Sequence, residues 1–121
     1  MAYQRDYNIN TRIVRIFNSY GSRMKLKNGC SIPVFFSQAL NNQPAIVFSD
    51  GNQTYSFIYI YDQLDGILNL LFSDGKEPVN IGNSEEITVK KMAGEIISLT
   101  NSKTKIVYEP LPIDNSQVRH P

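Results

Sequence analysis

The segment from Thr11 to Phe17 places the strongest constraint on how this chain folds. It reads Thr-Arg-Ile-Val-Arg-Ile-Phe, and its β-branched and aromatic residues predict a β-strand. Side chains alternate between the two faces of a strand, so Ile13, Val14, Ile16 and Phe17 lie on both faces. Strands that are apolar on both faces are typical of parallel sheets buried between helices. The segment therefore predicts a strand that is covered on both sides.

Helical and strand patterns alternate along the chain. Residues 1–8 resemble the end of a helix, residues 18–29 a polar loop and residues 110–121 an irregular tail. The other predicted elements are helices over 32–40, capped by Ser31, over 60–72, and over 89–97, capped by Thr88, and strands over 45–48, 55–60, 78–82 and 105–109. This alternation favours an α/β fold in which at least some strands pair in parallel.

Length and composition limit the class of protein. The 121 residues support one domain, and 12 basic against 11 acidic residues argue against a dedicated nucleic-acid-binding protein. No apolar run is long enough to span a membrane, and no signal-peptide pattern follows Met1. Cys30 is the single cysteine, which excludes an internal disulfide and is compatible with a reducing compartment. We expect a small cytoplasmic domain that binds neither nucleic acid nor membrane.

The chain has few residues for familiar kinds of catalysis. Its seven glycines are never closer than seven positions, so it contains neither a dinucleotide-binding fingerprint nor a P-loop. Cys30 and His120 could form a catalytic thiol–imidazole pair. The simpler interpretation is that the thiol lies in a loop, the imidazole lies in the tail, and the two do not meet.

Metal binding is not predicted either. The carboxylate pairs Asp62/Asp65 and Glu85/Glu86 lie near predicted helix starts, where the helix dipole favours negative charge without a metal. We therefore predict no metal ligands.

The loop after the first strand admits two interpretations. Arg23, Lys25 and Lys27 alternate along it, and Asn18 directly follows the strand. These residues fit a solvated loop, but they also fit an anion-binding site, because ligands of open α/β sheets gather beyond the carboxyl ends of strands. The asparagine amide is a suitable donor to phosphate or sugar oxygens. Spacing alone leaves both interpretations open.

Several short motifs occur in an order that is specific as a whole. They are Arg-Ile-Phe-Asn-Ser-Tyr-Gly at 15–21, Asp-Gly-Asn-Gln-Thr at 50–54, Ser-Phe at 56–57, Val-Asn-Ile-Gly-Asn at 79–83 and Pro-Leu-Pro at 110–112. Together they resemble extended short-chain dehydrogenase/reductases of the NAD-dependent epimerase/dehydratase family. The chain is most similar to the UDP-glucuronate decarboxylase subfamily, with dTDP-glucose 4,6-dehydratases and nucleotide-sugar epimerases as alternatives.

The resemblance implies the substrate-side portion of an incomplete Rossmann-type fold. Residues 1–121 would form a single partial domain: the end of the catalytic helix, a late Rossmann strand and a substrate-binding subdomain. In the implied reaction the sugar 4-hydroxyl of UDP-glucuronate is oxidised to a ketone, with NAD as hydride acceptor. The neighbouring carboxylate is then lost, and return of the hydride gives UDP-xylose. The resemblance also implies a UDP-sugar ligand and a homodimer.

The resemblance assigns binding roles residue by residue. Asn18 and Arg119 match residues that contact the diphosphate, and Asp50 and Gln53 lie in the turn that lines the nucleoside pocket. Tyr20 and Gly21 match the loop beside the nicotinamide. The full set of expected site residues is Asn18, Arg23, Asp50, Gln53, Tyr55 and Arg119 for substrate, and Tyr20 and Gly21 for cofactor.

Departures from the family pattern qualify these roles. Tyr55 stands where the family usually has a second substrate-binding arginine, Val34 replaces an asparagine, and Phe48-Ser49 replaces Tyr-Gly. None of the seven tyrosines has a lysine four residues later, so the catalytic Tyr-x-x-x-Lys pair is missing along with the glycine-rich loop. We assign no catalytic residue and expect the chain to be inactive alone. A non-catalytic binding module and a gene remnant are the competing interpretations.

Overall fold

The computed structural model describes residues 2–112. They form two compact units, and each is built from two separate stretches of the chain. The first unit contains residues 2–24 and 55–86, and the second contains residues 25–54 and 87–112.

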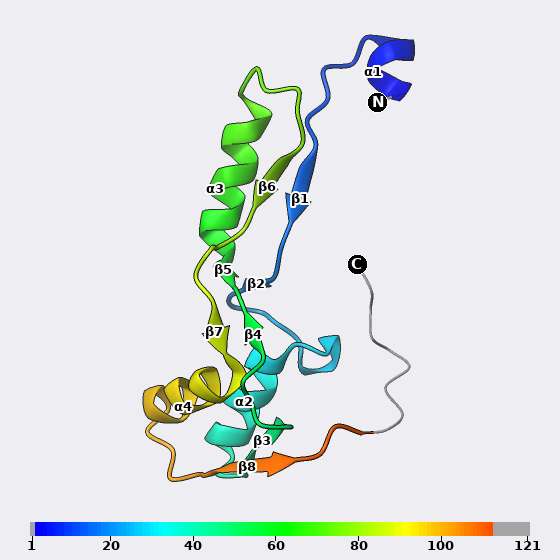
Figure 1. The fold of residues 1–121 in the computed structure, drawn as a ribbon. Coiled ribbons are helices and arrows are strands. Elements are labelled where there is room, and N and C mark those ends of the chain that lie inside the picture. Colours follow the sequence, from blue (N-terminus) through cyan, green and yellow to red (C-terminus); the bar gives the residue numbers. More distant parts are fainter. Residues whose placement is uncertain (1, 113–121) are drawn as a thin grey trace. The chain divides into compact units, whose positions relative to one another are not determined.

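The first unit is organised around a parallel pair of strands, β1 and β6 (Figure 1). Val14 lies opposite Val79 and Ile16 lies opposite Ile81. The pairing extends past both ends of the strands, because Val79 N donates to Ile13 O at 3.0 Å and Phe17 N donates to Ile81 O at 3.3 Å. The elements of this unit are α1 (Ala2–Tyr7), β1 (Val14–Ile16), β2 (Ser19–Tyr20), β5 (Ile58–Tyr59), α3 (Ile60–Leu71) and β6 (Val79–Ile81).

Helix α3 packs against this strand pair and supplies its covering layer. Gly66 allows the close approach, since a Cβ atom there would lie 3.1 Å from two carbon atoms of Ile81. Gln63, only 4% exposed, donates from Nε2 to Phe17 O at 3.4 Å. Arg12, which precedes β1, donates from Nε to the carbonyl oxygen of Ser73, in the loop that follows α3, at 2.9 Å. Gly66 thus packs on β6, and the bonds of Gln63 and Arg12 hold α3 and its loop to the residues that flank β1, more than forty positions away in the sequence.

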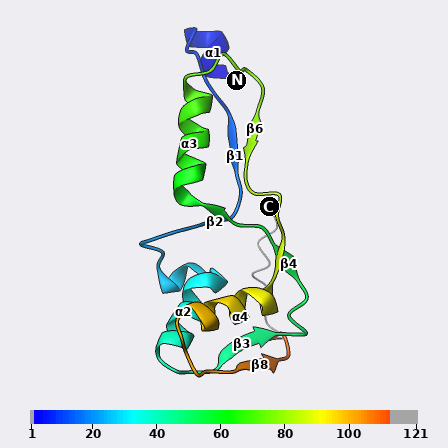
Figure 2. The same cartoon turned by 90° about the vertical axis from the view of Figure 1, so that its left-hand side faces the viewer.

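The second unit is built around another parallel pair, β3 and β8, in which Ala45 lies opposite Ile106 and Phe48 opposite Glu109. Helices α2 and α4 pack on each other and on β3 (Figure 2). Its elements are η1 (Leu26–Asn28), α2 (Ser31–Leu40), β3 (Ala45–Phe48), β7 (Ile87–Thr88), α4 (Val89–Leu99) and β8 (Ile106–Glu109); β4 (Thr54–Tyr55) pairs with β7. Its core comprises Phe35, Ala39, Ala45, Val47, Val89, Met92, Ala93 and Ile96.

The parallel α/β arrangement and most element positions are confirmed, and the caps are confirmed in part. Thr88 caps α4 as predicted, with its Oγ1 accepting from Lys91 N at 3.3 Å. The prediction that Ser31 caps α2 is wrong. Ser31 is already helical, and Cys30 holds the cap position without a side-chain hydrogen bond.

Two further predictions from local pattern are wrong. The single strand expected over 55–60 is divided into β4 and β5, and its last residue, Ile60, begins α3. The segment expected to be loop over 18–29 contains β2 and η1. Long-range strand pairing accounts for β2, β4 and β5: β2 pairs in parallel with β5, placing Ser19 opposite Ile58, and β4 pairs with β7, and neither pairing has a local signature.

The prediction that the first strand is covered on both sides is also wrong for the part of the chain described. Ile16 and Phe17 point to opposite faces, yet they are 56% and 50% exposed. Within residues 2–112, β1 has β6 as its hydrogen-bonded neighbour, and α3 covers only part of the pair. In the same range, no helix is both long and apolar enough to cross a membrane.

We predict that this exposed apolar surface makes the isolated chain self-associate. One edge of β1 has no strand partner among residues 2–112, and Ile16 and Phe17 are half-exposed, so further strand pairing and apolar contact are favoured. Light scattering should show the mass rising with concentration, and Ile16→Thr, which retains strand propensity, should reduce the effect. A monodisperse monomer at high concentration would contradict the prediction.

Two helical glycines provide a matched test of the packing. Gly94 in α4 has open space around its Cβ position, so Gly94→Ala should stabilise the fold by about 0.5–1 kcal/mol. Gly66→Ala carries the same gain in helix propensity but crowds Ile81, which is only 8% exposed. We expect a net destabilisation of about 1 kcal/mol. Thermal unfolding of both variants measures the difference, and equal stabilisation would refute the packing of α3 on β6.

Candidate functional site

The carboxyl ends of β1 and β6 meet at one edge of the first unit. Asn18 comes two residues after β1, and Gly82 comes directly after β6. Gly82 is packed on the other strand, because a Cβ atom there would lie 3.1 Å from the Phe17 side chain. The Asn18 carbonyl accepts a hydrogen bond from Ile58 N at 2.9 Å, which fixes the backbone. The Asn18 side chain is exposed and makes no hydrogen bond within residues 2–112.

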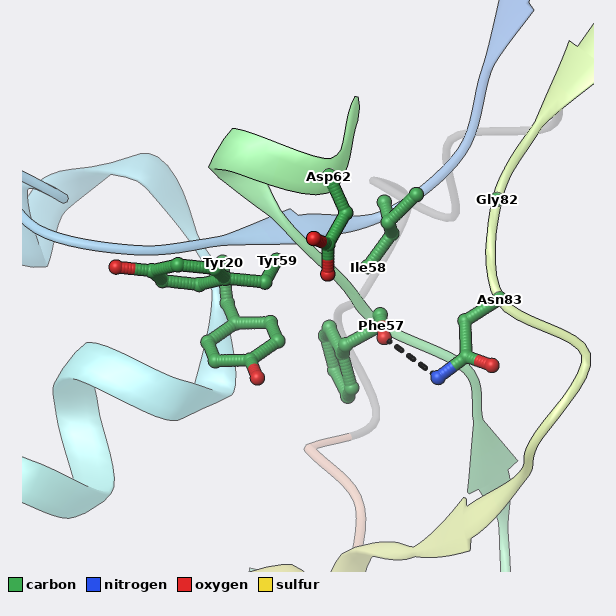
Figure 3. Close-up of a pocket in the computed structure, with 7 residues that line it drawn as sticks. All are labelled: Tyr20, Phe57, Ile58, Tyr59, Asp62, Gly82 and Asn83. Atoms are coloured by element: carbon green, nitrogen blue, oxygen red, sulfur yellow. Dashed lines mark hydrogen bonds between the residues drawn. The ribbon is translucent and has the colours of Figure 1, made fainter. Parts of the chain in front are cut away.

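A pocket of about 300 Å³ lies beyond these strand ends (Figure 3). Tyr20 and Tyr59 form an aromatic wall, with ring centroids 5.4 Å apart, and Phe57 contributes a third ring. The complete lining is Tyr20, Phe57, Ile58, Tyr59, Asp62, Gly82 and Asn83. The pocket therefore offers ring faces to a ligand, together with a few polar groups.

The two polar side chains of the pocket have different roles. Asn83 is used by the fold: its amide nitrogen donates to Phe57 O at 3.1 Å and its oxygen accepts from Glu85 N at 3.0 Å. Asp62 lies in the first turn of α3, and its side chain is among those that line the pocket (Figure 3). Asp62 can accept hydrogen bonds from a ligand.

Tyr20 and Gly21, the residues expected beside a cofactor, lie at this pocket and next to it. Tyr20 is 39% exposed and leaves part of its ring open for contact with a planar group. Gly21 is required by packing, since a Cβ atom there would lie 2.5 Å from Ile60 Cγ2. The ring of Tyr20 is thus partly open at the pocket, whereas Gly21 allows the segment after β2 to approach α3 closely.

In the second unit, the turn over residues 49–53 is held by its own side chains. Asp50 Oδ1 accepts from Asn52 N at 3.0 Å, and Asp50 Oδ2 accepts from Asn52 Nδ2 at 2.7 Å. Gly51 adopts a φ of +67°, which is unfavourable for residues with a side chain. Hydrogen bonds from Asn52, and secondarily the positive charge of Lys90, lower the pKa of the Asp50 carboxyl below its ordinary value.

The same turn closes the N-terminus of α4. Val89 N donates to Gln53 O at 3.0 Å, and Lys90 N donates to Gly51 O at 3.1 Å. These two amides are among the first four of the helix, which lack partners within it. Gln53 also donates from Nε2 to Phe48 O at 3.3 Å. The predicted ligand residues Asp50 and Gln53 thus also build the turn that presents them.

The remaining predicted residues are not brought into one cluster. Arg23 belongs to the first unit and has a φ of +68°, whereas Lys25 and Lys27 belong to the second. Tyr55 is 44% exposed, and its ring centroid lies 6.0 Å from that of Phe57. Arg119 and His120 lie outside the described residues, as does the rest of segment 113–121.

Of the four carboxylates considered as metal ligands, one lies in the first turn of a helix. Asp62 lies in the first turn of α3 as predicted, but Asp65 does not, and the first turn of α4 contains no acidic residue. The helix-start explanation is therefore wrong for Asp65, Glu85 and Glu86. No group of three or more potential metal ligands occurs within the part of the chain that the structure describes.

A parallel strand pair with polar residues beyond its carboxyl ends is the arrangement of Rossmann-type α/β proteins. The model of the NAD dependent epimerase/dehydratase family matches residues 1–82, and the chain belongs to this family. UDP-glucuronic acid decarboxylase 1 of Danio rerio is 38% identical over 120 residues, which are 99% of this chain and 29% of that protein. The chain thus spans less than a third of that relative's length.

Solved structures confirm the fold. An epimerase from Methanothermobacter thermautotrophicus gives a TM-score of 0.78 at 30% identity, with 89% of this chain and 33% of that chain covered. The UDP-glucose 4-epimerase of Thermotoga maritima, solved with UDP-glucose, gives a TM-score of 0.82 at 22% identity. The match covers 93% of this chain and 37% of the epimerase chain. At this identity the similarity supports the fold alone.

Sequence reasoning missed most of the residues that the structure places at these sites, among them Tyr59, Asp62 and Lys90. Tyr59 and Asp62 line the pocket, and Lys90 contacts the turn. Tyr59 and Asp62 closely follow the family-like Ser-Phe at 56–57, which is a signal that could have found them. Lys90 has no such signal, because its contact with Asn52 joins positions 38 residues apart.

The Asp50 carboxyl provides a pH test of the turn. Because its folded-state pKa lies below the unfolded value, the stability it contributes is present above the unfolded pKa and is lost as the pH falls through the folded pKa. Asn52→Ala should raise the pKa of Asp50 toward its ordinary value, as measured by NMR titration. Asn41→Ala, which removes a side-chain bond to Ser37 in the same unit, should leave it unchanged. An unshifted Asp50 in Asn52→Ala would show that Asn52 does not hold the carboxylate.

Proposed function

We propose that this chain is the substrate-side portion of a nucleotide-sugar decarboxylase, which converts UDP-glucuronate to UDP-xylose in the complete protein. The observation that carries this proposal is the identity to UDP-glucuronic acid decarboxylases, 38% over 99% of the chain in one relative and 39% over 95% in another. Support also comes from the fold, because ligands of such sheets bind beyond the carboxyl ends of the strands, where Asn18 and Tyr20 are found.

Two residues are proposed to hold the diphosphate. Asn18 presents an exposed amide just beyond the carboxyl end of β1, where its nitrogen can donate to a phosphate oxygen. The Arg119 guanidinium would bind two oxygens at once, as suits a bidentate donor. Arg23 adds positive charge in the loop after β2. Tyr55, in the place of an arginine, offers a ring and a hydroxyl but no positive charge.

The nucleoside and cofactor contacts are assigned to separate parts of the chain. The turn containing Asp50 and Gln53 is proposed to line the nucleoside pocket, held in shape by its bonds to Asn52 and α4. Tyr20 is proposed to contact the nicotinamide through its exposed ring, and Gly21 to keep that ring in place by packing on Ile60. NAD supplies the hydride acceptor and donor when bound.

The chain is proposed to be inactive by itself. A proton-transferring tyrosine with its lysine four residues later is absent from the 121 residues, and no other residue is assigned to that step. In the complete protein we propose a homodimer with NAD as cofactor. A non-catalytic module that binds sugar nucleotides is the second candidate, favoured by the exposed Asn18 amide and the hydrogen-bonded turn over 49–53.

The isolated chain should neither convert UDP-glucuronate nor bind UDP tightly. Incubation with UDP-glucuronate and NAD, followed by mass spectrometry, should yield no UDP-xylose, and calorimetry should give an affinity for UDP weaker than submillimolar. Submillimolar binding that is lost in Arg119→Ala would instead support the binding module. Upstream coding sequence separates the alternatives further: an in-frame glycine-rich loop and Tyr-x-x-x-Lys pair support the enzyme, and a stop codon directly before Met1 contradicts it for this gene product.

Tyr55 provides a gain-of-binding test. Tyr55→Arg restores a guanidinium at the position where the family usually has one, so it should strengthen UDP binding by about tenfold, in a salt-dependent way. Tyr61→Arg is the matched control, because Tyr61 is another exposed tyrosine, 62% exposed, with no proposed ligand role. Equal gains in both variants would indicate nonspecific attraction and count against the proposed diphosphate site.

A further inference from the structure

Lys90 connects the first turn of α4 to the turn over residues 49–53 through its side chain. Its Nζ donates to Asn52 Oδ1 at 2.5 Å. Its backbone is part of the same contact, since Lys90 N donates to Gly51 O at 3.1 Å. The two segments also touch through carbon atoms, because a Cβ atom at Gly51 would lie 2.9 Å from Lys90 Cβ and 2.7 Å from Val47 Cγ1. Lys90 is therefore the α4 residue with which the turn makes both main-chain and side-chain bonds.

The chemistry of the three side chains determines how Asn52 is oriented. A lysine ammonium group only donates hydrogen bonds, and a carboxylate only accepts them. Asn52 lies between the two, so its oxygen must face Lys90 and its nitrogen must face Asp50. Reversing the amide would place a donor against the ammonium and an acceptor against the carboxylate. Lys90 thus selects the orientation in which Asn52 holds Asp50.

The backbone of the turn needs such support. Ser49 has a φ of +58° and Gly51 a φ of +67°, so two of its residues adopt the left-handed region. For Ser49 this conformation is unfavourable, and surrounding contacts have to maintain it. The contacts present are the bonds from Asn52 to Asp50, from Lys90 to Asn52, and from the first amides of α4 to the turn carbonyls.

We propose that Lys90 is a positioning residue: by orienting Asn52 it holds the Asp50 carboxylate and the backbone of residues 49–53 in one conformation. The consequence for ligand binding rests on the proposed function, in which this turn lines the nucleoside pocket. The holding of the turn itself does not depend on that function and can be measured without a ligand.

The adjacent Lys91 provides a matched control. It lies on the same helix, and its ammonium group faces Glu95 at 3.9 Å rather than the turn. Lys90→Met removes the charge and keeps the apolar stem, Lys90→Arg keeps a cationic donor, and Lys91→Met removes a neighbouring charge. Net charge changes equally in the two methionine variants, so a difference between them reports position rather than charge.

Amide hydrogen exchange of the full chain, followed by NMR, tests the proposal. Exchange of the Asn52 and Val89 amides should be roughly twofold to fivefold faster in Lys90→Met, as expected for loss of one exposed charged contact. Lys90→Arg should retain protection, and Lys91→Met should resemble the original chain. In an Asn52→Ala background, Lys90→Met should add nothing further, because the effect passes through Asn52.

Three results would overturn the proposal: unchanged exchange in Lys90→Met, an equal effect of Lys91→Met, or a full Lys90 effect that persists without Asn52. If Lys90→Met fails to fold, Asn52→Ala alone must still accelerate exchange at Val89, and its failure to do so would be equally decisive. UDP titration is a separate measurement. Submillimolar binding that is lost in Arg119→Ala would contradict the proposed inactive enzyme portion and favour the binding module, and it would leave the exchange comparison as the test of Lys90.

Discussion

The parallel pairing of β1 with β6 is the interaction on which the first unit depends. Parallel strands cannot be joined by a tight turn, so the chain travels from Phe17 to Val79 before the second strand is added, and α3 lies on that path. The pairing brings two carboxyl ends to one edge, which is where Asn18 and the pocket lining are found. The location of the candidate site is therefore a consequence of strand direction.

In the second unit, the same hydrogen bonds stabilise the N-terminus of α4 and fix the shape of the candidate binding turn over residues 49–53. The first amides of α4 need acceptors, and the carbonyls of Gly51 and Gln53 provide them. These bonds also fix the backbone of residues 49–53, where the Asp50 and Asn52 side chains are hydrogen-bonded to each other. A change that frays the start of α4 should consequently reshape the turn, although the two are separated by more than thirty residues in the sequence.

The half-exposed residues of β1 connect the fold with the comparisons. Ile16 and Phe17 have the composition of a strand that is covered on both sides, and residues 2–112 leave both of them open. The chain spans 29% of the length of one UDP-glucuronic acid decarboxylase to which it is similar. Membership of the epimerase/dehydratase family is shown by residues 1–82, whereas the reaction belongs to the whole protein and remains a proposal for this chain.

Local signals in the sequence determined much of this protein. The periodic apolar residues of α2, α3 and α4, the β-branched runs of β3 and β8, and the Thr88 cap all act over a few residues, so they can be recognised without a fold. The same holds for the position of Asn18 just beyond a strand. Tertiary structure alone decided the pairing of β2 with β5, the division of the strand expected over 55–60, and the bond from Lys90 to Asn52. These depend on contacts between residues 38 or more positions apart, whose partners are chosen by packing and hydrogen bonding rather than by neighbours in the sequence.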